Sequence, residues 1–202
     1  MCGNSKTGII RFHAERGNSM SSEKEYKFLI NKEMFDRIGE KFFWNNVFSQ
    51  INFYYVDKNK KVIQDDITIR IRGKAEGLKL QIKVHESAKG ADHFSQEYEK
   101  EIKTIPYQIK STSLQGMGEY TFPDVTLVGY LITERRICNQ YNGIEICLDR
   151  NIYLNKEDYE LEIEYNTCTI PENLFEVIRE LNLDLEKTSK GKFGRFIDEL
   201  YK

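Results

Sequence analysis

The 202-residue sequence has few cysteines and histidines, and neither kind forms a recognisable metal or redox motif. None of the four cysteines belongs to a CxxC pair, which disfavours a zinc site and a thioredoxin-type redox pair. The three histidines are scattered and do not cluster with cysteine, so a histidine-based metal site has little support. Cys138 and Cys147 flank a turn at Asn142-Gly143, and we expect them to stay reduced although a hairpin would bring them near each other.

Long apolar runs and an excess of charge of one sign are also absent. With 30 basic and 32 acidic residues the formal net charge is -2, so a general nucleic-acid surface is disfavoured and any cationic site must be local. No apolar run approaches the roughly 20 residues of a membrane span. We therefore expect a cytoplasmic protein that contacts neither a membrane nor nucleic acid.

The chain is long enough for one large domain or two small ones. Its N-terminal segment lacks the apolar core of a secretory signal, and Met20 is a candidate start. We expect residues 1–20 to be a leader or a disordered extension, and residues 21–202 to form one domain.

Charge at every second position is what the sequence has in abundance. Five stretches show this pattern, with largely apolar residues between the polar ones: Glu23/Glu25/Lys27, Arg70/Arg72, Lys79/Gln81/Lys83, Glu97/Glu99/Glu101 and Glu160/Glu162/Glu164. A period of two sends these side chains to one face of a β-strand. For a single strand the ordinary interpretation is a solvated face. Over five strands, separate acidic and basic blocks favour a divided site for a divalent cation and a polyanion.

The pattern predicts eight strands and a few helices. The strands are expected near 23–30, 50–57, 65–73, 77–85, 95–103, 128–138, 143–151 and 158–166. Helices are expected at 32–45, after Pro106, from Pro171 with Leu174, Phe175, Ile178 and Leu181 on one face, and at 191–201, packing on the outside. Eight antiparallel strands with few helices indicate an α+β chain with one closed or nearly closed sheet.

The segment from Glu23 to Lys27 resembles the ExExK signature of the CYTH superfamily, also called triphosphate tunnel metalloenzymes. Later elements follow in the order of that family. They are Arg70 and Arg72 in an RxR pair, Lys83 on a basic strand, Glu97 and Glu99 in a Glu-x-Glu pair, a run of Gly129, Leu131, Thr133 and Arg135, then Asp149, the segment 158–164, and Ser189, Lys190, Lys192 and Arg195. The resemblance covers about residues 22–200, and its later half resembles a bacterial subgroup.

This resemblance implies a closed eight-stranded antiparallel β-barrel, a tunnel for triphosphate, with helices packed outside. It implies an enzyme that uses Mg²⁺ or Mn²⁺ to cleave the terminal phosphate of inorganic triphosphate or a related small triphosphate. A class IV-type adenylate cyclase, a thiamine triphosphatase and a non-catalytic polyphosphate-binding module remain alternatives, and an RNA triphosphatase is less favoured. A homodimer is left open.

The resemblance also implies roles for individual residues. The expected metal ligands are Glu23, Glu25, Asp149, Glu160, Glu162 and Glu164. The expected phosphate ligands are Lys27, Arg70, Arg72, Lys83, Arg135, Lys192 and Arg195. Glu97 and Glu99 are expected to act in catalysis by positioning water. Lys27 is a candidate proton acceptor whose pKa would be lowered by nearby Arg and Lys, and simple ion pairing with Glu23 or Glu25 is an equal alternative.

The charge pattern alone does not decide which of two consecutive arginines, Arg135 or Arg136, faces the interior of the expected barrel. A two-residue turn at Asn142-Gly143 would pair Arg136 with Asp149, whereas a three-residue loop with a bulge at Gly143 would pair Arg135 with Asp149. The spacing typical of the family favours Arg135.

Overall fold

The computed structural model describes residues 18–118, 120–165, 170–187 and 189–202 of the chain. In this part, nine strands form one antiparallel sheet. They are β1 (Asn18–Ile30), β2 (Asn46–Val56), β3 (Ile67–Lys74), β4 (Gly77–Lys89), β5 (Asp92–Ile102), β6 (Gln108–Ile109), β7 (Val125–Cys138), β8 (Ile144–Tyr153) and β9 (Lys156–Tyr165). The leader predicted at residues 1–20 lies mostly outside the described residues, and β1 begins at Asn18.

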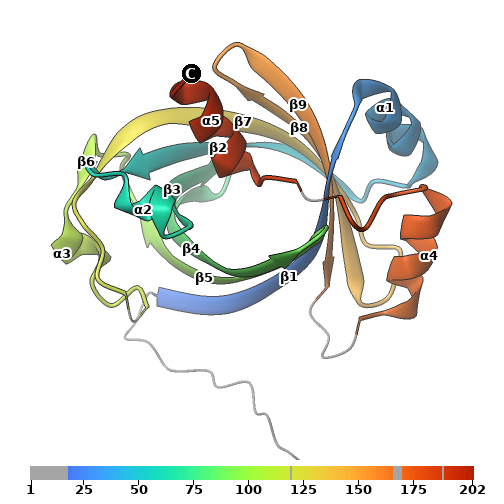
Figure 1. The fold of residues 1–202 in the computed structure, drawn as a ribbon, viewed down its shortest axis with the longest axis horizontal. Coiled ribbons are helices and arrows are strands. Elements are labelled where there is room, and N and C mark those ends of the chain that lie inside the picture. Colours follow the sequence, from blue (N-terminus) through green and yellow to red (C-terminus); the bar gives the residue numbers. More distant parts are fainter. Residues whose placement is uncertain (1–17, 119, 166–169, 188) are drawn as a thin grey trace, which may run out of the picture.

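Eight of these strands close into a barrel (Figure 1). They pair in the order β2-β3-β4-β5-β1-β9-β8-β7, and β2 also pairs with β7 along eleven positions from Asn46 to Val56, which joins the two edges. The predicted closed eight-stranded antiparallel barrel is therefore confirmed. The extra strand β6 pairs with β7 at Val125 and Thr126, outside the closed ring.

Five helices are described: α1 (Lys32–Lys41), α2 (Lys61–Gln64), α3 (Ser111–Leu114), α4 (Glu172–Glu180) and α5 (Lys192–Leu200). The side chain of Asn31 accepts a hydrogen bond from the Met34 amide at 2.8 Å, which fixes the start of α1. That helix was predicted to run to residue 45, but the backbone becomes extended at Phe42. No helix of the described residues is long and apolar enough to cross a membrane.

The apolar side chains of the alternating strands lie on the outer surface of the barrel, where helices cover them. Ile38 of α1 and Leu174 of α4 belong to one buried cluster with Leu161 of β9. Leu114 of α3 belongs to a second cluster with Ile82 of β4. Burying this outer surface is the main stabilising contribution to the fold, because each large apolar side chain contributes about 1.5–3 kcal/mol.

The buried face of α4 differs by one residue from the predicted face. Leu174, Ile178 and Leu181 are buried as expected, but Phe175 is 39% exposed and Val177 is buried instead. Val177 follows Leu174 by three positions, a spacing that returns to the same side of a helix, whereas Phe175 is rotated away from that side.

The C-terminal helix α5 was predicted to pack on the outside, and the structure places it over one end of the barrel instead. The Phe196 ring packs against the rings of Tyr54 and Tyr153, with centroid distances of 5.1 and 6.2 Å. Lys192, at the start of α5, reaches the carboxylate of Asp149 at 2.9 Å, and that carboxylate is fully buried in the barrel. Helix α5 therefore covers this end, and we call the opposite end the mouth of the tunnel.

We expect the substitution Gly129→Ala to destabilise this closure. Gly129 has a φ of 150°, and a Cβ atom there would lie 2.8 Å from the Phe196 ring, which is fully buried. The contact would push α5 away, at a cost of about 1–3 kcal/mol in the free energy of unfolding. Denaturant unfolding of both proteins would measure this loss.

Gly77→Ala is the matched control for this prediction. Gly77 has a similar φ of 142°, but a Cβ atom at this position would have no neighbour within 4 Å. The substitution therefore introduces the backbone strain alone. Equal destabilisation by the two substitutions would contradict a specific contact between Gly129 and Phe196.

Candidate active site in the barrel

The charged rows of the alternating strands line the interior of the barrel. All fifteen residues singled out in the sequence have buried or partly buried side chains, despite their charge. Eight of them are buried: Glu25, Lys27, Arg70, Lys83, Asp149, Glu160, Glu162 and Lys192. The other seven, Glu23, Arg72, Glu97, Glu99, Arg135, Glu164 and Arg195, are partly buried. Charged side chains are rarely buried without partners, so their contacts define the site.

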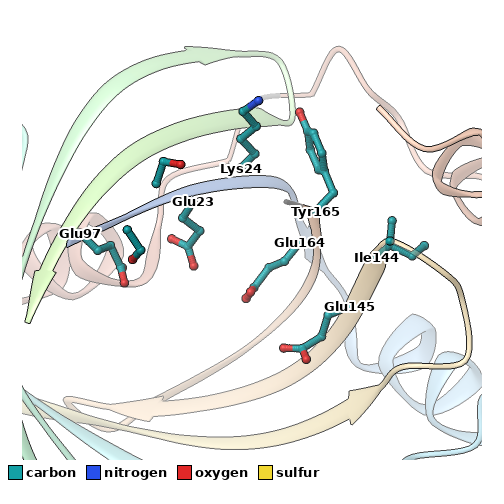
Figure 2. A pocket seen from close by; sticks show the side chains of 10 residues that line it. Glu23, Lys24, Glu97, Ile144, Glu145, Glu164 and Tyr165 are labelled. Carbon is teal, nitrogen blue, oxygen red and sulfur yellow. The ribbon is translucent and has the colours of Figure 1, made fainter. Parts of the chain in front are cut away.

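One group of carboxylates comes from two neighbouring strands near the mouth. Each of Glu23 and Glu25 of β1 and Glu164 of β9 offers a carboxylate oxygen, and these oxygens lie within 4.8 Å of one another. Glu25 and Glu164 are direct partners in the register of β1 and β9. Figure 2 shows Glu23 and Glu164 pointing into the same cavity, which has a volume of about 420 Å³.

Negative charge in this group is only partly balanced. Lys27 and Lys83 contact Glu25 at 2.8 and 3.2 Å, and despite burial they lower its pKa to about 2. By contrast, burial and then the neighbouring Glu23 raise the pKa of Glu164 to about 8. Among the described residues, Arg135 is the cation that lies within ion-pair distance of Glu164, and the two groups are 3.5 Å apart. Lys83 also contacts Glu23, so Glu164 is the least compensated of the three carboxylates. Clustered carboxylate oxygens of this kind suit a hard divalent cation such as Mg²⁺ or Mn²⁺.

A second group of carboxylates lies deeper, near α5. Asp149, Glu160 and Glu162 also bring carboxylate oxygens within 4.8 Å of one another. In this group the ammonium of Lys192 partly balances the negative charge. It contacts all three carboxylates, at 2.9 Å from Asp149 and 2.7 Å from Glu162. Arg195 adds contacts to Glu160 and to Asp158. The two carboxylate groups therefore have the same ligand type but different charge balance.

Arg135, and not Arg136, faces the interior. The register pairs Arg135 with Asp149, and its guanidinium donates two hydrogen bonds to that carboxylate, at 2.8 and 2.7 Å. Arg136 lies on the outer surface, with its guanidinium 5.3 Å from the centroid of the Phe35 ring. Gly143 has a φ of 81°, as a loop with a glycine bulge requires.

Lys27 has acidic rather than basic surroundings. Burial lowers its pKa, but the attraction of Glu25 and Glu162 outweighs that effect, and the pKa of Lys27 is raised overall. Its ammonium group lies 2.8 Å from Glu25 and 3.7 Å from Glu162. The expectation of a lowered pKa is therefore wrong, because the attraction of these carboxylates outweighs both burial and the repulsion from Lys83. The ion-pair alternative with Glu25 is what the structure contains.

The opposite wall, on β3, has an excess of positive charge. Arg70 contacts Gln81 at 3.0 Å and Glu97 at 3.5 Å, whereas Arg72 donates to the neutral amide of Asn52 at 3.0 Å. Burial and the neighbouring Arg70 lower the pKa of Arg72 to about 10. Two adjacent guanidinium groups with little carboxylate compensation are suited to a phosphate chain.

Glu97 and Glu99, predicted to act together, lie in different surroundings. Glu97 lies between the two walls, 3.5 Å from Arg70 and 3.6 Å from Lys83, and despite burial these cations lower its pKa. Glu99 lies closer to the mouth, where it accepts hydrogen bonds from Lys79 at 2.6 Å and Gln81 at 2.9 Å. Glu97 therefore adjoins the phosphate-binding arginines, whereas Glu99 is held at the rim.

Sequence reasoning missed an uncharged polar row on β2. Gln50, Asn52 and Tyr54 are each at most 2% exposed. Among the described residues, both amide atoms of Gln50, Nδ2 of Asn52 and the hydroxyl of Tyr54 have no hydrogen-bond partner. Their alternation with apolar residues within the predicted strand 50–57 is the pattern that could have revealed them. It was missed because the search followed charged residues, and these three are uncharged.

The two cysteines of the β7–β8 hairpin lie on opposite faces of it. Cys138 belongs to the outer apolar cluster, whereas the Cys147 thiol lies inside, 3.6 Å from Glu145 and 3.8 Å from Glu164. Both are free thiols, as expected, and their opposite orientation prevents a disulfide. Cys2 and Cys168 lie outside the described residues.

A family model for the CYTH domain matches residues 21–197, and no curated protein matches the sequence significantly. Several solved structures share the fold. A candidate adenylate cyclase from Bacillus halodurans has 21% sequence identity and a TM-score of 0.67, covering 88% of this chain and 98% of that chain. A candidate adenylyl cyclase from Hippeastrum, described as having a dominant triphosphatase activity, has 18% identity and a TM-score of 0.67, covering 87% and 95%. The capping-enzyme triphosphatase of mimivirus has 13% identity and a TM-score of 0.51, covering 80% and 88%.

Proposed function

The chain belongs to the CYTH domain family, and from this premise we propose that it is a divalent-metal-dependent triphosphatase. Its substrate is inorganic triphosphate or a related small triphosphate, from which it removes the terminal phosphate. One observation carries this proposal. A single lumen holds Glu164, whose pKa burial and Glu23 raise to about 8, and on the opposite wall the adjacent Arg70 and Arg72, of which Arg72 has no carboxylate within ion-pair distance among the described residues. A triphosphate with its divalent cation complements both.

The carboxylates would hold the cation. Glu23, Glu25 and Glu164 fit Mg²⁺ or Mn²⁺ best, because they offer three clustered oxygens and the raised pKa of Glu164 shows that its negative charge is poorly compensated. Asp149, Glu160 and Glu162 are a second candidate group, in which Lys192 already balances the charge. When bound, a divalent cation neutralises charge on phosphate oxygens and polarises the phosphorus centre.

The basic side chains bind and orient the phosphates. Arg70 and Arg72 present planar guanidinium groups from β3, and Lys83 lies on the neighbouring strand β4, paired with Thr68. Arg135 and Lys192 contact carboxylates in the structure, and phosphate oxygens offer them equivalent anionic partners. Lys27 and Arg195 complete the set. Because these groups are held in the fold before substrate arrives, little reorganisation is needed when charge develops on the phosphate oxygens.

Water must be positioned for attack on the terminal phosphorus. We assign this role to Glu97, which adjoins Arg70 and Lys83, with Glu99 as a supporting residue nearer the mouth. The lowered pKa of Glu97 favours its ionised form, which accepts a hydrogen bond from water. Lys27 fits a phosphate ligand better than a proton acceptor, since its raised pKa keeps it protonated.

Phosphate release from a panel of substrates tests this proposal. The purified protein should release phosphate from inorganic triphosphate with Mg²⁺ or Mn²⁺, and removal of the metal by EDTA should abolish the release. Thiamine triphosphate, ATP and long-chain polyphosphate complete the panel, and cyclic AMP is measured in the ATP sample. Formation of cyclic AMP without phosphate release would instead support a cyclase. Binding of polyphosphate without any turnover would support a non-catalytic module.

A further inference from the structure

Two adjacent tyrosines of β2, Tyr54 and Tyr55, are equally buried but differ in how their hydroxyl groups are satisfied. Both side chains are 0% exposed. The hydroxyl of Tyr55 donates a hydrogen bond to the carbonyl oxygen of Pro106 at 2.7 Å. Among the described residues, no group forms a hydrogen bond with the hydroxyl of Tyr54. A buried hydroxyl without a partner destabilises the folded state, so it indicates a donor that is kept free for a ligand.

The ring of Tyr54 is held in place by its neighbours. It packs against the rings of Phe193 and Phe196 of α5, with centroid distances of 5.1 Å in both cases. In the register of β2 and β3, Tyr54 is paired with Arg70, one of the two arginines of the cationic wall. A side chain that is already held by packing loses little further freedom when its hydroxyl binds a ligand.

The charges around this hydroxyl are mainly positive. Burial raises the pKa of Tyr54, so the hydroxyl stays protonated and is available as a donor. The four charged groups with the largest effect on its pKa are all cations: Arg70, Lys192, Arg72 and Arg195. A protonated hydroxyl in such surroundings suits an anionic acceptor, such as a phosphate oxygen, and disfavours a cationic ligand.

The preceding inward residue of β2, Asn52, also has a free donor. Its amide oxygen accepts a hydrogen bond from Arg72 at 3.0 Å. Its amide nitrogen, which can only donate, has no partner within the described part of the chain, although the side chain is 0% exposed. Free donors on β2 therefore run beside the guanidinium pair of β3, and the two rows fit one linear phosphate chain.

We propose that Tyr54 is a phosphate ligand, whose hydroxyl donates a hydrogen bond to an oxygen of the phosphate bound between Arg70 and Lys192. This inference rests on the proposed triphosphatase function and adds an uncharged residue to the charged phosphate ligands inferred above. Asn52 supplies a second donor to the same chain. The hydroxyl gains its partner when the phosphate binds, so binding removes an unfavourable feature of the free protein.

The substitution Tyr54→Phe tests the proposal, because it removes the hydroxyl and keeps the ring that packs against α5. For inorganic triphosphate with Mg²⁺, kcat/KM should fall about 10- to 100-fold, the range expected when a hydrogen bond to a charged acceptor is lost. The Kd of inorganic triphosphate, measured by calorimetry in EDTA, should rise by a similar factor. The Tm of the ligand-free variant should equal or exceed that of the unchanged protein, whereas a merely structural role of the hydroxyl predicts a lower Tm.

Tyr55→Phe is the matched control, because its hydroxyl already has a partner in the loop before β6. It should have a lower Tm and keep its kcat/KM within about twofold. An unchanged kcat/KM and Kd in Tyr54→Phe, or a Tm below that of the unchanged protein, would overturn the proposal. Phosphate release by the unchanged protein would then still support the triphosphatase function. If no triphosphate is cleaved but Tyr54→Phe weakens the binding of inorganic triphosphate, the function falls and the role of Tyr54 stands.

Discussion

Replacing Glu25 with Gln should abolish metal-dependent phosphate release, with a fall in kcat of about 10³-fold or more. Glu25 is 2% exposed and has a central position in the lining. It contributes an oxygen to the carboxylate group with Glu23 and Glu164, and it fixes the ammonium groups of Lys27 and Lys83. The substitution would weaken metal binding and displace two candidate phosphate ligands at once. Steady-state rates against Mg²⁺ concentration would measure both effects.

The same substitution should cost stability. The folded-state pKa of Glu25 is about 2, below the ordinary value of 4.5. Its stabilising contribution is therefore complete above pH 4.5 and is lost as the pH falls toward 2. At pH 7 the loss on substitution is about 3 kcal/mol. Circular dichroism at the assay temperature must show a folded variant before its rate is interpreted.

Glu33→Gln is a control for this experiment, because Glu33 is an exposed residue in the first turn of α1, outside the barrel. Its rate and metal dependence should equal those of the unchanged protein. A Glu25→Gln variant that folds and keeps more than a tenth of the rate, with the same dependence on Mg²⁺, would rule out the metal-binding role of Glu25.

Replacing Glu164 with Gln should have the opposite effect on stability. In the metal-free protein the pKa of Glu164 is about 8, well above the ordinary 4.5. The folded state then binds the proton more tightly than the unfolded state between these values, so stability falls as the pH rises from 4.5 to 8. Gln cannot ionise and removes this penalty. Because the side chain is 26% exposed, we expect a gain of about 2–3 kcal/mol at pH 8.5, or roughly 5–10 °C in Tm.

The metal response separates this prediction from a general stabilisation. Adding Mg²⁺ should raise the Tm of the unchanged protein at pH 8.5, because a ligand that binds the folded state stabilises it. It should raise the Tm of Glu164→Gln much less, and phosphate release should be strongly reduced. At pH 4.5 the two metal-free proteins should melt at nearly the same temperature. A variant that is less stable than the unchanged protein at pH 8.5 would contradict unbalanced charge at Glu164.

The sequence was sufficient to predict the barrel and the composition of its lining. Alternation at Glu160, Glu162 and Glu164 fixes which side chains share a face, because a strand has a period of two. It does not determine whether that face points inward or outward. The order of motifs along the chain decided that question through the family resemblance, and the same spacing identified Arg135 rather than Arg136.

Contacts between distant strands could not be predicted in this way. The pKa of Lys27 depends on its distance from Glu162 of β9, a residue 135 positions later in the chain. The position of α5 over the barrel end depends on how Phe196 meets Tyr54 and Gly129, and an amphipathic helix pattern fits an outer surface equally well. The uncharged row at Gln50, Asn52 and Tyr54 was not predicted for a different reason. In the sequence, amide side chains in a strand cannot be distinguished from residues on a solvated face.

The pairing of β1 with β9 has a consequence for how the protein is made. Glu25 leaves the ribosome early, but its partner on the adjacent strand, Glu164, follows only after most of the chain has been synthesised, and Lys192 follows later still. Contacts so far apart in sequence form slowly. The carboxylates of β1 therefore stay hydrated during translation. The apolar side chains on the outer face of the early strands stay exposed to water until the later strands and helices have been synthesised. Apolar surface that is exposed for this interval favours aggregation, so the barrel is safest from it once β9 has closed on β1.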